Sequence, residues 1–452
     1  MVAWTGWPCQ GRGLDAAAIR PHVTGAEVAA RVGGAAPEQG IGDAVVDLLP
    51  AVIACSRAQN GRFLGYVLGS GEPVGAAVEG LASVLNQNVT AWRSAPAAVA
   101  IERTVVGWLA EAIGCRGFDG HLTGGGSAAN LMGLTMAREA KAPANDAGAT
   151  PGVVYASTEV HLSIGKAVAL LGLGRRNLRL VAVDDGLRLS VPALERAIEE
   201  DLAAGRRLIA VVASAGTVAT GAVDPIAAIA DVAARHGLWL HVDGAYGALA
   251  ALAEPDLLGP LARADSLSLD AHKWLYQAVD CGCLLFRDPA AARAAFSTHA
   301  DYVRALDADP VEGFAFFDQS LELSRRFRAL RLWTSLRYHG LAAFRAALCA
   351  DLAHARALAA RITGEPRLEL LAPVTLSAVC FRVRFPADAD ARNLKVLERV
   401  NVRGRVYLSN ATVRGAFALR ACFVNHRTTD ADVDVVADEV LAAAGEVATS
   451  TP

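Results

Sequence analysis

A lysine and an aspartate stand at the ends of two apolar segments, thirty positions apart. Lys273 follows the alternating run Ser266–Asp270 after one alanine and one histidine, and Asp243 closes the apolar run Leu238–Val242. An amine can bind an aldehyde cofactor covalently, and a carboxylate can hold a proton on a pyridine nitrogen. Taken alone, Lys273 would be interpreted as a surface lysine and Asp243 as an aspartate that merely ends a strand. The pair, read together with the motifs below, predicts a pyridoxal phosphate site.

Three consecutive glycines, Gly124–Gly126, separate the segment His121–Thr123 from a helical stretch that runs to about Lys141. Glycine lets the backbone approach a ligand closely, and Ser127 adds a hydroxyl beside the free N–H groups of a helix start. No lysine follows the last glycine at the spacing of a nucleotide P-loop. A glycine-rich helix entry is often only a turn, but this one also has the composition of a phosphate cradle.

His161 lies at the start of a helix that follows a predicted strand. Ligands bind α/β sheets at the carboxyl ends of strands, so an imidazole there can lie flat on a cofactor ring. The mostly small residues Gly244–Gly247 follow Asp243 and leave room for such a ring. Ser214–Thr217 ends another strand, and Thr217 is predicted either to contact the cofactor or to form a simple turn.

Strand and helix signals alternate from about residue 86 to residue 290. We expect strands at Gly152–Ala156, Leu208–Ala213, Leu238–Asp243, Ser266–Leu269 and Gly282–Phe286. A helix between two of them should begin with a cap at Asp224-Pro225 and end at His236-Gly237. Strands separated by helices predict an α/β fold with a mainly parallel sheet.

The remaining segments suggest three domains: an N-terminal arm at 1–85, a large cofactor-binding domain at 86–320, and a smaller C-terminal α+β domain at 321–452. Residues 291–318 show little periodicity and predict a mobile active-site loop. Beyond it we expect a basic helix at Ser324–Tyr338 and a strand at Leu419–Val424. Thr429 and Asp432 should cap the last helix.

The composition excludes several classes of protein. Apolar residues make up 53% of the 452 residues, and 43 basic against 46 acidic residues give a net charge of −3. No basic stripe suggests nucleic acid, and we find neither an apolar run long enough for a membrane span nor a signal peptide. The eight cysteines show neither disulfide-framework nor zinc-ligand spacing, so we predict no metal site, buried thiols and a reducing cytoplasm.

These segments, in this order, resemble the group II pyridoxal-dependent amino acid decarboxylases, the family of aromatic-L-amino-acid, tyrosine and glutamate decarboxylases. The resemblance runs from Arg62–Tyr66 to Leu419–Thr429. Its most specific motifs are His241–Tyr246, Asp270–Trp274 and Arg325–Leu330 with Trp333 after it. The family implies the fold of fold type I pyridoxal phosphate enzymes, which is aspartate aminotransferase-like, and a homodimer in which the N-terminal arm wraps the partner.

The resemblance also implies a role for individual residues. Lys273 carries the cofactor, Asp243 pairs with its ring nitrogen, His161 stacks on the ring, Ala245 packs under it, and Gly126, Ser127 and His272 hold the phosphate. Tyr302 is similar to the tyrosine of the family's catalytic loop, which donates a proton to Cα. Asp270 stands where many relatives have asparagine, a departure that bears on its contact with the phosphate.

We therefore expect pyridoxal phosphate-dependent decarboxylation of an L-amino acid with an aromatic or otherwise bulky side chain, giving an amine and carbon dioxide. One alternative is decarboxylation with oxidative deamination to an aldehyde. Another is transamination, in which Arg420 would hold the substrate carboxylate. A non-catalytic DNA-binding regulator would need a basic N-terminal domain, which residues 1–85 do not supply. Five aromatic residues could either line a substrate pocket or pack in the core, and the sequence favours neither role: Phe63, Trp92, Phe314, Phe316 and Phe317.

Overall fold

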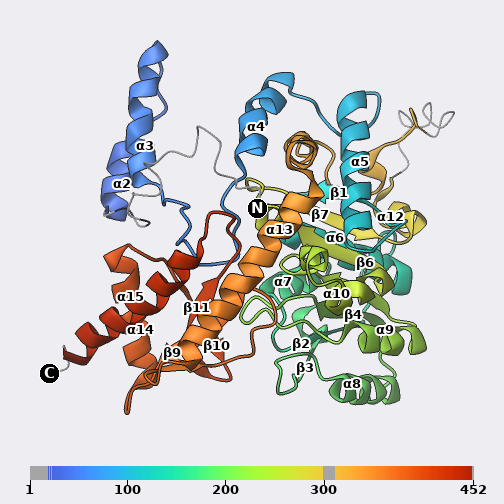
Figure 1. Ribbon diagram of the computed structural model, residues 1–452. Coiled ribbons are helices and arrows are strands. Elements are labelled where there is room, and N and C mark those ends of the chain that lie inside the picture. Colours follow the sequence, from blue (N-terminus) through green and yellow to red (C-terminus); the bar gives the residue numbers. More distant parts are fainter. Residues whose placement is uncertain (1–18, 20, 22, 299–310, 450–452) are drawn as a thin grey trace.

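The computed structural model describes residues 19, 21, 23–298 and 311–449. A seven-stranded sheet in the order β1-β7-β6-β5-β4-β2-β3 forms its centre (Figure 1). Its strands are β1 Asp119–Thr123, β2 Val153–Ser157, β3 Leu178–Val181, β4 Leu208–Ser214, β5 Trp239–Asp243, β6 Ser266–Asp270 and β7 Gly282–Phe286. Every neighbouring pair is parallel except those that include β7. The predicted mainly parallel α/β sheet is confirmed.

Helices cover both faces of this sheet, so its central strands are buried throughout. Successive residues of β4 show the arrangement, because Val211 belongs to one apolar cluster and Val212 to another. The first cluster includes residues of α5 Pro96–Ala112, α8 Val191–Ala203 and α9 Ile226–Arg235, and the second includes residues of α6 Gly126–Lys141, α7 Leu162–Leu170 and α12 Pro289–Phe296. Alternate side chains of a strand point to opposite faces, which explains its unbroken apolar sequence.

A second, four-stranded antiparallel sheet lies in the C-terminal part of the chain. Its order is β10-β11-β9-β8, with β8 Leu368–Leu370, β9 Ala378–Val383, β10 Ser409–Val413 and β11 Ala416–Cys422. The helices α14 Ala389–Arg403 and α15 Asp430–Thr449 pack against it. The helical segment α13, Ala329–Thr363, connects the two lobes in Figure 1 and is kinked at Gly340, whose φ is +74°. Its first part contributes Leu330 to the large core and its second part Leu358 to the small one.

Within the N-terminal arm, the helices α2 and α3 stand away from the rest of the described chain (Figure 1). Its helices α2 Gly25–Val32 and α3 Leu49–Cys55 bury no residue, and large apolar side chains such as Val46 and Ile53 are exposed. Helix α4, Pro73–Leu85, packs instead on α13. No helix in the described ranges combines the length and apolar character that a membrane span requires.

Several predicted boundaries were wrong. The segment 291–318 begins inside α12, and the predicted helix Ser324–Tyr338 begins only at Ala329. Arg325 is not helical because its N–H donates to Asn88 Oδ1 and its carbonyl accepts the N–H of Val89. Its backbone therefore pairs with the loop before α5.

Of the two predicted helix caps, only one forms. Asp224 does not cap α9, since its carboxylate accepts the N–H groups of Leu189 and Ser214, both at 2.7 Å. The cap at Thr429 is confirmed, because its N–H donates to Asp432 Oδ2 at 2.9 Å. The expected strand at 419–424 spans 416–422, and β1, β3, β8, β9 and β10 were not predicted. The domain boundaries after 85 and 320 stay predictions.

Candidate active site

One pocket lies where β4, β5 and β6 end beside the start of α6. Every predicted cofactor-contacting residue lines it, namely Gly126, Ser127, His161, Thr217, Asp243, Ala245, His272 and Lys273. The carboxyl ends of parallel strands lie at one edge of a sheet, so residues far apart in the sequence meet there. Tyr302, the predicted proton donor, lies outside the described residues.

Lys273 projects from a single helical turn, α11 Ala271–Trp274, that directly follows β6. Its Nζ lies 3.0 Å from Oδ2 of Asp270, and Nε2 of His272 lies 3.6 Å from the same oxygen. Asp270 is almost fully buried, and its Oδ1 has no partner among the described residues. The acid at this position therefore places a negative charge beside the lysine and the glycine turn.

Asp243 ends β5, and three protein groups donate hydrogen bonds to its carboxylate. Asn130 Nδ2 donates to Oδ2 at 3.0 Å, whereas Ser268 Oγ and the N–H of Ala245 donate to Oδ1 at 3.1 and 3.2 Å. A buried charge is stable only when such groups replace water. The side chain is thus held as a carboxylate at the pocket floor, the form that can pair with a protonated ring nitrogen.

His161 is the N-cap of α7, and its ring accepts a hydrogen bond from the N–H of Ser163 at 3.3 Å. Burial lowers the pKa of His161, and the nearby Lys273 lowers it further, while Asp243 raises it. Burial likewise lowers the pKa of His272. Both imidazoles are therefore neutral at pH 7, which suits one for stacking and the other for donating a hydrogen bond to an anion.

Two glycines of the turn cannot be replaced, Gly125 because of its backbone conformation and Gly126 because of its close neighbours. Gly125 has φ +124°, a conformation that residues with a Cβ rarely adopt. A Cβ on Gly126 would lie 2.5 Å from Cβ of Ala245 and 3.1 Å from Oδ2 of Asp270. His272 faces the same turn, with Cε1 3.6 Å from a Cβ built on Gly125. Backbone N–H groups of the first turn of α6 thus border the pocket directly.

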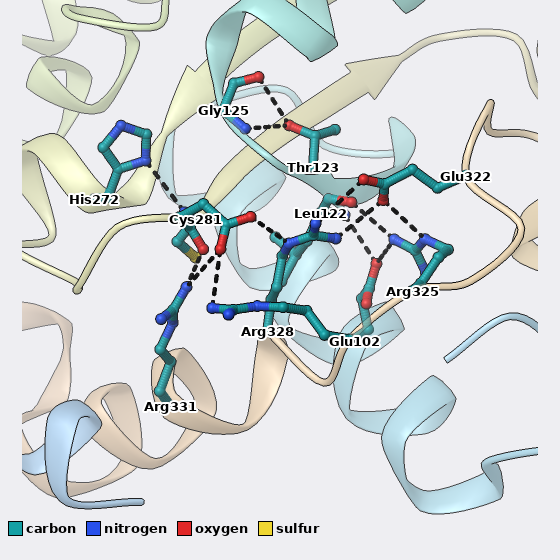
Figure 2. A network of polar contacts seen from close by, with 12 residues as sticks. Glu102, Leu122, Thr123, Gly125, His272, Cys281, Glu322, Arg325, Arg328 and Arg331 are labelled. Atoms are coloured by element: carbon teal, nitrogen blue, oxygen red, sulfur yellow. Dashed lines mark hydrogen bonds and ion pairs between the residues drawn. The ribbon is translucent and has the colours of Figure 1, made fainter. Parts of the chain in front are cut away.

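An arginine cluster from the Arg325–Arg331 segment fixes both sides of this turn (Figure 2). Arg325 donates to the carbonyl of Leu122 at 2.8 Å and pairs with the buried Glu102, which holds β1. Arg328 Nε donates to Asp280 Oδ2 at 2.9 Å, and its two terminal nitrogens bind Glu322. The sequence motif was recognised but its contacts were not predicted, because its partners lie up to 252 positions away in the chain.

The neighbouring chain folds back onto the same turn. The N–H of Cys281 donates to Nδ1 of His272 at 3.2 Å (Figure 2), and a Cβ on Gly282 would lie 2.5 Å from Cα of Gly125. The segment that carries Asp280 therefore packs directly against the glycine cradle. A glycine that follows Asp280-Cys281 was the one available sequence signal for this contact.

Thr217 and Arg420, two residues with a predicted role, form hydrogen bonds within the protein. Thr217 lines the pocket, but its hydroxyl also contacts Thr220 at 3.1 Å and accepts the N–H of Ala222, so it contributes to a turn as well. Arg420 Nε donates to the carbonyl of Ala219 at 2.9 Å, and Nη1 to that of Tyr66 at 3.2 Å. Arg420 is not among the residues that line the pocket.

The predicted aromatic set does not line this pocket either. Phe63 stacks on Tyr407 with ring centroids 5.0 Å apart, and Phe316 is buried under Arg325. Trp92 and Phe314 pack against the large core, and Phe317 borders a separate groove. In the described part of the chain these rings therefore contribute to core and surface packing, and a contact with substrate stays a prediction.

The residues of this pocket fit pyridoxal phosphate. The glycine cradle and the first turn of α6 provide N–H donors for a phosphate, and Lys273 provides an amine for the aldehyde. The paired carboxylate of Asp243 and the small side chain of Ala245 suit a flat, protonated pyridine ring. No cluster of side chains suited to a metal ion occurs among the described residues.

Comparisons with known proteins agree with this fit. Residues 51–384 match the model of the pyridoxal-dependent decarboxylase conserved domain. An aromatic-L-amino-acid decarboxylase of Bacillus atrophaeus is 35% identical over 400 residues, which cover 86% of this chain and 82% of that protein. A phenylacetaldehyde synthase of Petunia hybrida is 31% identical over 387 residues, 80% of this chain and 76% of that one. The solved structure of Oryza sativa TDC with PLP and tryptamine matches with a TM-score of 0.90 and 28% identity, covering 96% of this chain and 94% of that one.

The position of Asp270 leads to a prediction about cofactor affinity. Asp270→Asn keeps the shape of the side chain and removes a buried negative charge beside the phosphate cradle, so pyridoxal phosphate should bind roughly threefold to tenfold more tightly. Fluorescence titration of the cofactor-free full chain measures the dissociation constant. Asp265→Asn, at the other end of β6, removes the same charge away from the pocket and should leave the constant unchanged. An equal or weaker affinity of Asp270→Asn would contradict the prediction.

Proposed function

The chain belongs to the pyridoxal-dependent decarboxylase family and is a pyridoxal phosphate-dependent amino acid decarboxylase, and on this premise we propose that its substrate is an aromatic L-amino acid. Two observations support this substrate class. Relatives named for aromatic substrates cover most of the chain. In addition, Val218 and Val279 line the pocket with 41% and 63% of their surface exposed, so they offer apolar contacts to a large apolar side chain.

We further propose the following division of roles in the pocket. Lys273 binds the cofactor covalently, and Asp243 pairs with the ring nitrogen and keeps a proton there. His161 stacks on one face of the ring and Ala245 packs on the other. Gly126, Ser127 and His272 hold the phosphate, and Thr217 contacts the ring substituents. When bound, pyridoxal phosphate accepts into its ring the electrons that the departing carbon dioxide leaves behind.

The single observation that carries this proposal is the shared pocket of Lys273, Asp243 and the glycine cradle. A stable Asp243 carboxylate would strengthen protonation of a ring nitrogen by roughly 1–3 pKa units, or about 1.4–4 kcal/mol. A Cβ on Gly126 would lie 2.5 Å from Cβ of Ala245, so only glycine lets the cradle lie this close to the residue proposed to pack under the ring. The residues thus bind, orient and electrostatically prepare the cofactor.

Borohydride reduction of the purified protein should fix pyridoxal phosphate on Lys273, because this amine projects into the pocket. Lys273→Ala should lower kcat for aromatic amino acids by on the order of 10³-fold or more. Peptide mapping locates the label, and released amine and carbon dioxide are measured across the standard L-amino acids. Lys166→Ala, which removes an exposed lysine of the nearby helix α7, is the matched control and should retain wild-type activity. A label on Lys166, or a preference for small polar substrates, would contradict the proposal.

The alternative product is an aldehyde, and a relative named phenylacetaldehyde synthase keeps this alternative open. The amine forms only if a protein acid donates a proton to the substrate Cα after carbon dioxide leaves. We propose that the phenol of Tyr302 is this acid and that the amine is the main product. Without this acid, oxygen would take two electrons from the carbon and be reduced to hydrogen peroxide, and hydrolysis by water would then release ammonia and an aldehyde.

Tyr302→Phe keeps the ring and removes the proton, so the variant should still bind cofactor and release carbon dioxide. Its product should shift from amine toward aldehyde, with oxygen consumed and ammonia released. The amine-to-aldehyde ratio under air is the decisive measurement, and Tyr338→Phe, at an exposed position of α13, is the control. An unchanged ratio at near-normal rate would exclude Tyr302 as the donor. Aldehyde from the wild-type protein would favour the oxidative alternative.

We also propose that the protein is a homodimer in the cytoplasm. The arm helices α2 and α3 expose apolar side chains and bury none, which supports their covering by a second copy. An obligate interface of this kind buries on the order of 2,000 Å² or more.

The seven described cysteines are free thiols, as a reducing compartment maintains. Light scattering that shows an active monomer, or cell fractionation that places the protein outside the cytoplasm, would contradict these two proposals.

A further inference from the structure

A buried chain of polar side chains connects α6 with the sheet beneath the pocket. It includes Asn130 on α6, His241 on β5 and Ser266 on β6, and each is at most 1% exposed. None of the three was assigned a role from the sequence. Their atoms form successive contacts of 2.8–3.0 Å that end on Asp243 and, through Ser163, on His161. Since no water reaches them, each donor must face an acceptor.

The direction of every hydrogen bond follows from Asp243. A carboxylate only accepts, so the group of Asn130 that lies 3.0 Å from it must be the Nδ2 amide nitrogen. The Oδ1 of Asn130 therefore faces His241 Nε2 at 2.9 Å, and Nε2 must carry a proton. His241 is neutral, since burial lowers its pKa to about 4. Its Nδ1 is then an acceptor.

The far end of the chain is consistent with this direction. Trp239 Nε1, which only donates, lies 2.8 Å from Oγ of Ser266. The serine hydroxyl is then free to donate its own proton to His241 Nδ1 at 2.8 Å. All bonds from Trp239 to Asp243 therefore run the same way, and each donor polarises the next.

A second hydrogen bond from Asn130 determines the tautomer of His161. Asn130 Nδ2 also lies 3.0 Å from Oγ of Ser163, so this hydroxyl accepts from Asn130 and donates to His161 Nδ1 at 2.8 Å. The N–H of Ser163 points to the same nitrogen at 3.3 Å. Two donors directed at Nδ1 leave the ring proton of His161 on Nε2.

The backbone of α6 is shaped for this chain of contacts. Gly133 lies three residues after Asn130, on the same face of the helix. A Cβ at Gly133 would lie 2.5 Å from Cε1 and 2.6 Å from Nδ1 of His241. Only glycine lets α6 lie this close to the imidazole, so the spacing of Asn130 and Gly133 provides both the contact and the space for it.

We propose that Asn130 is a positioning residue that fixes the Asp243 carboxylate and, through Ser163, the tautomer of His161, with His241 and Ser266 holding the Asn130 amide in the required orientation. This inference rests on the proposed function for its effect on the cofactor. The tautomers themselves follow from the hydrogen bonds of the two neutral imidazoles and do not depend on the cofactor. The Asn130 amide thereby orients both residues proposed to contact the ring: Asp243 at the ring nitrogen and His161 on the ring face.

The first test is independent of cofactor and activity. Nitrogen NMR of the histidine-labelled full chain, freed of cofactor, reports which ring nitrogens carry protons. Both His161 and His241 should be protonated at Nε2 and unprotonated at Nδ1 near neutral pH. Asn130→Leu removes the donor that orients the Ser163 hydroxyl but keeps the Ser163 N–H directed at Nδ1, so it should weaken this preference at His161 without abolishing it. Protonation at Nδ1 of either histidine in the wild-type protein would overturn the proposal.

The second test measures the effect on cofactor and substrate. Asn130→Leu should weaken pyridoxal phosphate binding by roughly tenfold, shift the visible absorption of the bound cofactor and lower kcat by tenfold or more with KM within about twofold. Thr135→Val, on the same helix, is the matched control and should resemble wild type. Wild-type affinity, spectrum and kcat in a folded Asn130→Leu protein would refute the positioning role.

A pair of substitutions at His241 keeps the proposal testable if Asn130→Leu does not fold. His241→Gln retains an N–H that can reach Asn130 Oδ1, whereas His241→Phe fills the space without a donor. Glutamine should restore most of the affinity and kcat that phenylalanine loses, and equal behaviour of the two would count against the chain of contacts. A wild-type protein that neither binds the cofactor at Lys273 nor decarboxylates would instead contradict the proposed function and leave the NMR result standing.

Discussion

The buried carboxylate of Asp243 is the constraint on which the pocket depends. An ion removed from water loses several kcal/mol of solvation unless protein groups replace it. Here the N–H of Ala245, the hydroxyl of Ser268 and the amide of Asn130 supply that replacement. Each donor comes from a different place, because Ala245 follows β5, Ser268 lies on β6 and Asn130 on α6. The stability of one charge therefore fixes how the helix and the two strands fit together.

The same logic holds on the other side of the glycine cradle, where charges occur in matched sets. Arg328 lies between Asp280 and Glu322, and Arg325 forms a buried pair with Glu102. Removing one member of a buried pair leaves an uncompensated charge, which costs about 3–5 kcal/mol. These pairs hold β1 and the chain after Asp280 on either side of Gly125. The cradle keeps its shape because the charged groups around it are paired with one another.

Much of this arrangement could be predicted from the sequence. Strand ends at Asp243 and near Lys273, and the glycine run before α6, are local patterns, and local patterns survive in the folded chain. The α/β class followed from the alternation of apolar runs, and the family from the order of the motifs. Thr217 illustrates the intermediate case, since it forms the turn and also lines the pocket, while its contact with the cofactor stays a prediction.

The features that could not be predicted depend on contacts between residues that are far apart in the sequence. Nothing near Asn130 indicates that His241 lies 2.9 Å away, and nothing near Arg325 indicates Glu102. The helix expected from Ser324 fails for the same reason, because Arg325 exchanges backbone hydrogen bonds with the loop at Asn88 and Val89. Short strands such as β8 carry too few residues to show a period. Long-range pairing, rather than local propensity, decides these features.

The charges in the pocket explain why its phosphate cradle is built from the backbone. Among the described residues that line it, Asp243 and Asp270 are acidic and Lys273 is basic, while burial keeps His161 and His272 neutral. The lining thus has a net negative charge before any phosphate enters. The guanidinium groups nearby cannot offset it, since Arg328 is already bound by Asp280 and Glu322. The N–H groups and dipole at the start of α6 are what remains to attract a phosphate, and they work only if the backbone comes close. That requirement accounts for Gly125 and Gly126, whereas Asp270 supplies a repulsion that the helix start has to overcome.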